Sequence, residues 1–245
     1  MKNTVKNHEV NPNFTNRRDF LKIGGFGVVG AGLLMAVGCS DDDDASAPVD
    51  NQLPGVRNGV FDIGGGDFGV LTYAYALEQL EADFYTKVVA NFGSYSEEAK
   101  DIFSDLHKHE VIHREFFKAA LSDALPDPST QLLPNLTFSY GNLDFTSQSA
   151  VTDVAIKLED TGVSAYNGAG KLITNAAYLV IAGQIVSVEA RHASAVRDLK
   201  SPGTNAFANT TDANGLDPAQ DPSAIITAVK SLGLITTPFT AAYLP

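Results

Sequence analysis

Cysteine is almost missing from this 245-residue sequence, which holds only Cys39. Without a second cysteine no disulfide can form within the chain, so a packed core or a bound metal has to provide the stability. Basic residues are also scarce: 17 Lys and Arg stand against 29 Asp and Glu, which gives a formal net charge of −12. This surplus of negative charge makes nucleic acid and anionic membrane surfaces poor partners.

The apolar run at residues 23–38 is shorter than the about 20 residues that a membrane-spanning helix needs. The segment just before it contains Arg17 and Arg18 in the order Asn-Arg-Arg-Asp-Phe-Leu-Lys, which closely resembles a twin-arginine export signal. Residues 1–38 are therefore expected to be a signal peptide that is recognised by the twin-arginine export machinery.

The same run ends in Ala-Val-Gly-Cys, with Cys39 as its last residue. This ending resembles a bacterial lipobox, whose cysteine is acylated and becomes the mature N-terminus. The resemblance implies an exported lipoprotein that is held on the membrane by a lipid at Cys39. An uncleaved signal anchor with an unmodified cysteine is the alternative.

Four aspartates, at residues 41–44, follow the cysteine, and small residues and prolines continue to residue 54. Like charges without apolar partners stay solvated, so residues 39–66 are expected to form a flexible tether. The acidic run also resembles the tag that follows the acylated cysteine in surface-exposed lipoproteins of Bacteroidetes-type bacteria. The sequence leaves open whether the protein is periplasmic or on the outer cell surface.

Two stretches of the form Glu-x-x-His organise the rest of the chain: Glu110 with His113, and Glu189 with His192. Residues three apart lie on one face of a helix, so both side chains of such a pair can reach one metal ion. A matching segment precedes each stretch. Glu78 precedes the first and Glu159 the second, and each is followed seven residues later by a tyrosine, Tyr85 or Tyr166.

The chain thus reads as a duplicated helical pair with four carboxylates and two imidazoles. This is the ligand set of a dinuclear iron or manganese site inside a four-helix bundle. The predicted ligands of two divalent ions are Glu78, Glu110, His113, Glu159, Glu189 and His192. Four buried carboxylates in one core would not be tolerated without compensating cations.

Apolar periodicity predicts the four helices of this bundle at 68–91, 97–121, 149–173 and 176–199, with Pro126 as the stop after the second. A possible capping box, from Ser94 to Glu97, marks the expected start of the second helix. Short links make each pair an antiparallel hairpin, and residues 122–148, with a strand-like part at 136–145, form a long crossover between the second and third helices. Residues 67–200 are then the bundle, and residues 201–245 are a C-terminal extension with a short helix at 222–232.

The segments LEQLEADFY, HEVIHREFFKAAL, LEDTGVSAY and VEARHASAVR resemble the ferritin-like domain family of bacterial lipoproteins and desiccation- or stress-associated proteins. The resemblance covers residues 68 to about 200 and implies an all-α, ferritin-like four-helix bundle with a di-metal carboxylate centre on the six ligands named above. Many di-iron relatives carry an Asp just before the glutamate of Glu-x-x-His as a partner of a ligand histidine. In this chain His109 and Val188 occupy those two positions. The departure puts the tuning and the reactivity of the metals in doubt.

The resemblance also implies that Tyr85 and Tyr166 donate hydrogen bonds to ligand carboxylates of the opposite half, although both can be plain core aromatics. Glu81 competes with Glu78, because it lies one turn further along the same predicted helix; the repeat favours Glu78. His107 can reach the edge of the site, but a solvated histidine is the preferred interpretation.

Two kinds of function fit this sequence. In the first, the metal pair is redox-active and oxidises Fe(II) or consumes peroxide or dioxygen, so that a small oxidant is the partner. In the second, the metals only hold together an envelope or stress-associated protein. Iron storage in a closed shell is disfavoured, because a lipid anchor and a C-terminal extension on every subunit are awkward for a cage.

Overall fold

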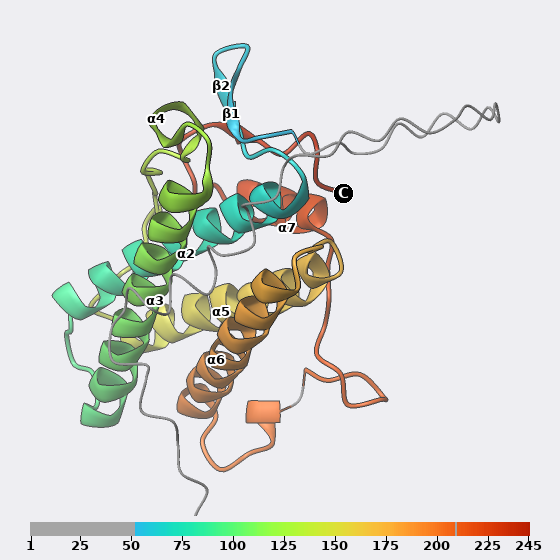
Figure 1. Ribbon diagram of the computed structural model, residues 1–245. Helices are drawn as coiled ribbons and strands as arrows, with labels where there is room; N and C mark the ends of the chain where they lie inside the picture. The colour runs from blue at the N-terminus through green and yellow to red at the C-terminus, as the bar shows by residue number, and fades with distance from the viewer. Residues whose placement is uncertain (1–51, 209) are drawn as a thin grey trace, which may run out of the picture. The chain divides into compact units, whose positions relative to one another are not determined.

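The computed structural model describes residues 52–208 and 210–245 (Figure 1). The predictions that concern Arg17, Arg18, Cys39 and the acidic run at 41–44 lie outside the described residues.

Four long helices form the body of the protein, and they confirm the predicted four-helix bundle. They are α2 (Gly66–Ala90), α3 (Glu97–Ala124), α5 (Gln148–Gly170) and α6 (Ala176–Lys200). Figure 1 shows them as two hairpins, in which α2 packs along α3 and α5 packs along α6. Contacts of α2 with α5 and of α3 with α6 join the two hairpins around one core.

Side-chain caps fix where three of these helices begin. Ser96, Ser147 and Asn175 each accept a hydrogen bond from a backbone N–H in the first turn of α3, α5 and α6, respectively. The predicted capping box at Ser94 is therefore wrong by two residues: the serine whose hydroxyl reaches the N–H of Ala99, at 3.1 Å, is Ser96.

The start of α2 is tied to the turn between α5 and α6. The carboxylate of Asp67 accepts hydrogen bonds from the backbone N–H of Thr174 (2.7 Å) and of Asn175 (3.0 Å). This contact holds the ends of the two hairpins together, because it satisfies donors that the turn leaves open.

The crossover at residues 125–147 contains the single turn α4 (Pro128–Gln131) and runs along α2. The Gln79 side chain accepts from the backbone N–H of Leu136 (2.7 Å) and donates to the carbonyl of Pro134 (3.3 Å). The predicted strand at 136–145 is wrong. Within the described residues it amounts to one bridge between Phe138 and Ile235, and the backbone N–H of Leu136 donates to the Gln79 side chain of α2 instead of to a neighbouring strand.

A small sheet, which the sequence did not predict, joins the two ends of the described chain. Strands β1 (Gly55–Arg57) and β2 (Val60–Asp62) form an antiparallel hairpin, and β2 pairs in parallel with β3 (Phe239–Thr240). Asp62 is 1% exposed and accepts from the Thr240 hydroxyl at 2.6 Å. The predicted tether at 39–66 therefore extends too far, since its last residues belong to the folded unit.

The C-terminal extension packs on α6 through η1 (Ala206–Ala208), and on α5 through α7 (Pro222–Ser231) and the residues just before it. The backbone N–H of Gln220 donates to the carbonyl of Ser164 at 3.1 Å. This approach needs Gly168, because a Cβ there would lie 1.7 Å from the carbonyl oxygen of Gln220. The short helix confirms the predicted one, and β3 lies between it and the last five residues.

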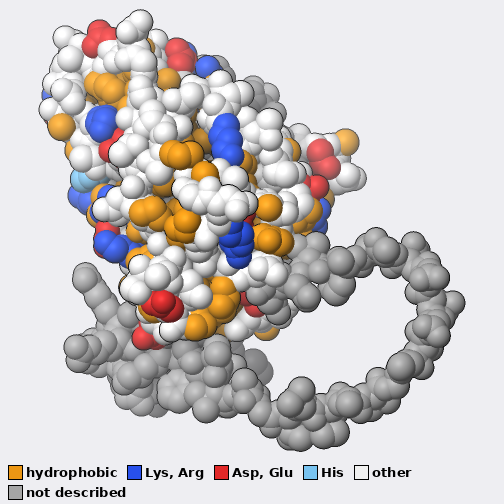
Figure 2. Space-filling view, turned by 90° about the horizontal axis from the view of Figure 1, so that it is seen from above, with side chains coloured by type: hydrophobic (Ala, Val, Ile, Leu, Met, Phe, Trp, Pro, Cys, Tyr) orange, Lys and Arg blue, Asp and Glu red, His pale blue; other side chains and the backbone are white. Residues whose placement is uncertain are grey.

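The apolar core lies between the four helices and continues under the sheet and α7. On the face in Figure 2, hydrophobic side chains form small spots that alternate with separate acidic and basic ones. No helix in the described part of the chain is both long enough and apolar enough to cross a membrane.

Candidate metal centre

Six ionisable side chains meet in the middle of the bundle, and each long helix contributes at least one. The glutamates are 0% exposed, and His113 and His192 are 8% and 3% exposed. The residues that the structure brings together are the six that the sequence predicted: Glu78 on α2, Glu110 and His113 on α3, Glu159 on α5, and Glu189 and His192 on α6.

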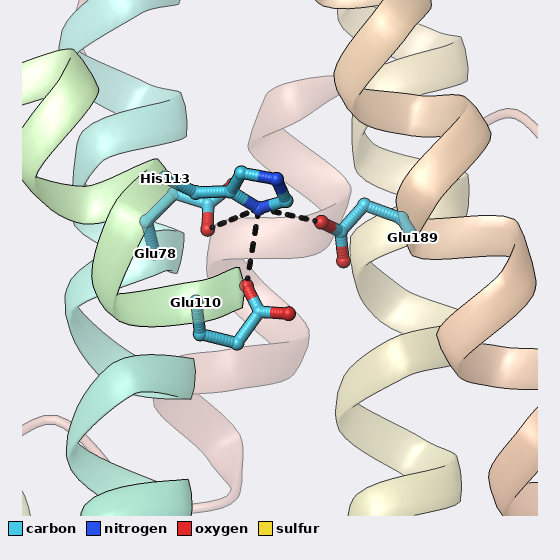
Figure 3. A group of neighbouring side chains, drawn as sticks. All are labelled: Glu78, Glu110, His113 and Glu189. Carbon is cyan, nitrogen blue, oxygen red and sulfur yellow. Dashed lines mark ion pairs between the residues drawn. The ribbon is translucent and has the colours of Figure 1, made fainter. Parts of the chain in front are cut away.

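The first group of possible ligands surrounds the Nδ1 atom of His113, as Figure 3 shows. This nitrogen lies 3.0 Å from Oε1 of Glu189, 3.4 Å from Oε2 of Glu78 and 3.4 Å from Oε2 of Glu110. The side chains come from three helices, so the convergence exists only because the two hairpins pack against each other.

The second group surrounds the Nδ1 atom of His192. Its carboxylate neighbours are Oε1 of Glu110 at 2.7 Å, Oε2 of Glu159 at 3.5 Å and Oε2 of Glu189 at 3.8 Å. In each group the ligand atoms all lie within 4.8 Å of one another. Glu110 and Glu189 belong to both groups and turn one oxygen toward each histidine, which is the arrangement of bridging carboxylates between two ions.

The unsatisfied atoms of the site fit two cations. Most of the buried side-chain atoms that lack a hydrogen-bond partner in the described chain belong here: Oε2 of Glu78, Glu81 and Glu159, both oxygens of Glu110 and Glu189, and Nδ1 of His113 and His192. Buried polar atoms are normally paired, because an unpaired one costs about 1–3 kcal/mol, and more if charged. Lone pairs that converge without a donor are what a metal ion satisfies.

The same conclusion follows from the proton affinities of these groups. Burial raises the pKa of Glu78 to about 7. Burial alone would also raise the pKa of Glu110, but the imidazoles of His113 and His192 beside it lower it to about 2. Burial alone would lower the pKa of His192, yet the neighbouring carboxylates, first Glu110, raise it to about 10. Without metal, protons therefore have to supply the positive charge in the core.

Tyr85 and Tyr166 hold two of the carboxylates from across the bundle. The Tyr85 hydroxyl, on α2, donates to Oε1 of Glu159 on α5, and the Tyr166 hydroxyl, on α5, donates to Oε1 of Glu78 on α2. These are the cross-half hydrogen bonds that the resemblance implied. They leave Oε2 of each glutamate turned toward a histidine.

Both candidates from the first helix lie inside the bundle. The sequence favoured Glu78 over Glu81 as the ligand, and Glu78 does belong to the group around His113. Glu81 is also buried, at 3% exposure, and its Oε2 has no hydrogen-bond partner. The core therefore contains five glutamates, one more than the sequence predicted.

Sequence reasoning missed the contact of His109. Its Nδ1 lies 2.9 Å from Nε2 of His192, and the two rings are stacked at 9° with 5.1 Å between their centres. If Nδ1 of His192 binds a metal, Nε2 carries the proton and donates a hydrogen bond to Nδ1 of His109. The available signal was the position of His109 directly before Glu110, where di-iron relatives carry the Asp that does this. His107, by contrast, is in neither ligand group.

Comparison with known proteins agrees with this geometry. The model of the ferritin-like domain family matches residues 66–202, which span all four long helices. The chain belongs to the ferritin-like domain family. The residues that this ferritin-like domain gathers in its core are the carboxylates and imidazoles described above.

Among solved structures, the chain is similar to a protein from Thermotoga maritima that is assigned as a ferritin-like diiron-carboxylate protein. The two sequences are 21% identical, the TM-score is 0.43, and the match covers 56% of this chain and 95% of the other. No curated protein matches the chain.

Proposed function

We propose that this chain is an exported, lipid-anchored protein whose ferritin-like domain binds two iron or manganese ions and reacts with peroxide or dioxygen, or oxidises Fe(II), in protection against stress. The observation that carries the proposal is the pair of overlapping ligand groups that share Glu110 and Glu189. Two ions held by common carboxylates, when bound, exchange electrons with a small oxidant as a pair.

The donor set favours iron or manganese. Oxygen and imidazole nitrogen are the only donors in the two groups, and carboxylates outnumber histidines. Zinc sites usually have fewer carboxylates, and copper(I) prefers sulfur ligands. Six side chains around two ions also leave coordination positions for an exogenous molecule, whereas a purely structural ion is closed by four ligands.

The protein groups around the ligands support reactivity. The hydroxyls of Tyr85 and Tyr166 fix the outer carboxylates, and His109 orients His192. Such partners raise the basicity of ligands and tune a metal's reactivity. His109 is thus the hydrogen-bond partner of the ligand histidine His192, in place of the aspartate that this chain lacks.

The space beside the centre favours a small substrate. An apolar cavity of about 20 Å³, lined among others by Leu77, Phe117, Tyr166 and Ala182, lies between the long helices. It has room for about one water-sized molecule. Because the Tyr166 hydroxyl also donates to Glu78, the cavity shares a wall with the metal site. The bare backbone of Gly162 leaves no further path to the centre, since Glu81 lies against that glycine.

The test is to load the purified full chain with Fe(II) or Mn(II) and to follow the consumption of peroxide and dioxygen. The control is a Glu110→Gln, Glu189→Gln double variant, which lacks both shared carboxylates but keeps their shape. We expect the double variant to lose oxidant consumption. Equal rates in the two proteins would instead favour metals that only stabilise the bundle.

Export and anchoring rest on sequence motifs alone, the Arg17–Arg18 pair and the Ala-Val-Gly-Cys39 run. The twin-arginine route moves folded proteins, so the metals can be loaded before export. A Cys39→Ala variant should lose its lipid and leave the membrane fraction of cells that express it, and lipid on the variant would contradict the proposal.

A further inference from the structure

Glu81 is a buried carboxyl side chain for which the six-ligand centre has no role. It lies on α2, one turn after Glu78, and both are buried, at 3% and 0% exposure. A buried carboxylate without a partner costs several kcal/mol, so such a group is kept only where something compensates its charge. In the described chain, no side chain or backbone group gives Oε2 of Glu81 a hydrogen bond.

The space for Glu81 is created by a glycine on the facing helix. A Cβ at Gly162 would lie 3.1 Å from Oε1 of Glu81 and 3.5 Å from Oε2 of Glu189. The first contact is tight enough that the Glu81 carboxylate would have to shift by a few tenths of an ångström. Glu81 and Glu189 are therefore neighbours over the bare backbone of Gly162, and Glu81 points to the ligand cluster and not to solvent.

The internal repeat shows that this arrangement breaks a near symmetry. Glu78 and Glu159 are equivalent ligands of the two halves, and the residues three positions after them are Glu81 and Gly162. One half thus adds a carboxylate at the position where the other half has the glycine that makes room for it. The two metal sites consequently have different surroundings, although their basic ligands match.

The position of Glu81 also indicates which site it serves. Its neighbour, Oε2 of Glu189, is the oxygen that faces His192, whereas Oε1 of Glu189 faces His113. Glu81 therefore lies on the side of the ion that Glu159 and His192 would hold. Two divalent ions are neutralised by four of the glutamates, so the fifth favours a higher positive charge in this half of the centre.

We propose that Glu81 is a fifth carboxylate ligand of the di-metal centre, that it binds the ion of the Glu159–His192 side, and that it makes the two ions inequivalent. The inference rests on the proposed binding of two metals by the ferritin-like domain. It adds a ligand to only one of the two sites. The function of Gly162 is then to leave that ligand its place.

Calorimetric titration of the metal-free full chain with Mn(II) tests the inference. Wild-type protein should bind two ions. Glu81→Gln should lower the affinity for the ion of the Glu159–His192 side at least tenfold and leave the affinity for the other ion unchanged. Glu78→Gln should instead lower the affinity for the ion of the His113 side. Glu98→Gln, at an exposed position in the first turn of α3, is the matched control and should bind both ions as the wild type does.

A second variant shifts Glu81 without changing any carboxylate. In Gly162→Ala, the new methyl group should shift the Glu81 carboxylate by a few tenths of an ångström and weaken the binding of the same ion that Glu81→Gln weakens. If Glu81→Gln binds both ions with wild-type affinity, or loses both to the same extent, the inference is overturned. If the wild type binds no metal, the failure lies in the proposed function and not in the role of Glu81.

Discussion

His109 shows at the residue scale how a neighbour defines what a ligand can do. The imidazole is exposed, but its Nδ1 lies 2.9 Å from Nε2 of the buried His192. A partner on the far nitrogen of a ligand histidine fixes both the tautomer and the ring orientation. A neutral imidazole is such a hydrogen-bond partner without the negative charge of the aspartate that di-iron relatives have at the same position.

Replacing His109 should therefore weaken the binding of one metal ion without unfolding the bundle. We expect His109→Ala to lower the affinity for the ion at His192 by about 10- to 100-fold, the usual effect of removing such a partner. His107→Ala is the control, since His107 is in neither ligand group. Calorimetric titration with Mn(II) measures the effect, and equal affinities in the two variants would contradict the role of His109.

At the scale of the elements, the two hairpins carry the same ligand pattern but differ in what covers them. The crossover fastens to α2 through Gln79, and the C-terminal extension fastens to α5 through Ser164. Each attachment depends on a local feature of one helix: a long amide side chain in the first case and the absence of a side chain at Gly168 in the second.

The glycine at 168 should be indispensable for the attachment of the extension. Its replacement by alanine places a Cβ 1.7 Å from a backbone oxygen, which cannot move as a side chain could. We expect Gly168→Ala to lower the free energy of unfolding by about 1–3 kcal/mol, the usual range for overpacking. Urea denaturation of the metal-free protein, together with proteolysis of the extension, measures this.

Gly183→Ala is the matched control, because nothing lies within 4 Å of a Cβ at this exposed position of α6. Here alanine should raise the stability by about 0.5–1 kcal/mol, since glycine is unfavourable inside a helix. If both variants were equally stable, the close approach of Gln220 to α5 would not contribute to the fold.

For the molecule as a whole, the buried centre links folding to protons and metals. The folded state raises the pKa of Glu78 from 4.5 to about 7 and that of His192 from 6.5 to about 10. In both cases the folded protein holds a proton that the unfolded chain has already released, so stability falls as pH rises across these intervals. The pKa of Glu110 is lowered from 4.5 to about 2, so its contribution to stability is lost as pH falls below 4.5. Above pH 4.5 this contribution stays constant.

The metal-free protein should therefore melt at a lower temperature at pH 8 than at pH 5. Its free energy of unfolding should fall by up to about 1.4 kcal/mol per pH unit for each group that titrates. Bound metal should reverse the trend, because ions replace the protons and bind more tightly as pH rises. Thermal melts from pH 5 to pH 8, with and without Mn(II), measure both effects. A metal-free melting temperature that rises with pH would contradict this account.

The helices, their pairing and the six residues of the candidate centre could be predicted from the sequence alone, because the evidence for them is local or repeated. Glu110 and His113 are three residues apart on one helix, and the pattern of Glu78 and Tyr85 recurs in Glu159 and Tyr166. A helical period and a duplication can be read without knowing what packs where. The link lengths between helices then limited the topology to a bundle with a crossover.

Features that depend on contacts between distant segments could not be predicted, because they follow from how the helices pack. Glu78 and Glu81 lie one turn apart, and the room for the second comes from Gly162 on another helix. The contact of His109 with His192 spans 83 residues, and the hydrogen bond from Thr240 to Asp62 spans 178. Periodicity shows which face of a helix is buried, but the partners on that face are set by the packing of the whole chain.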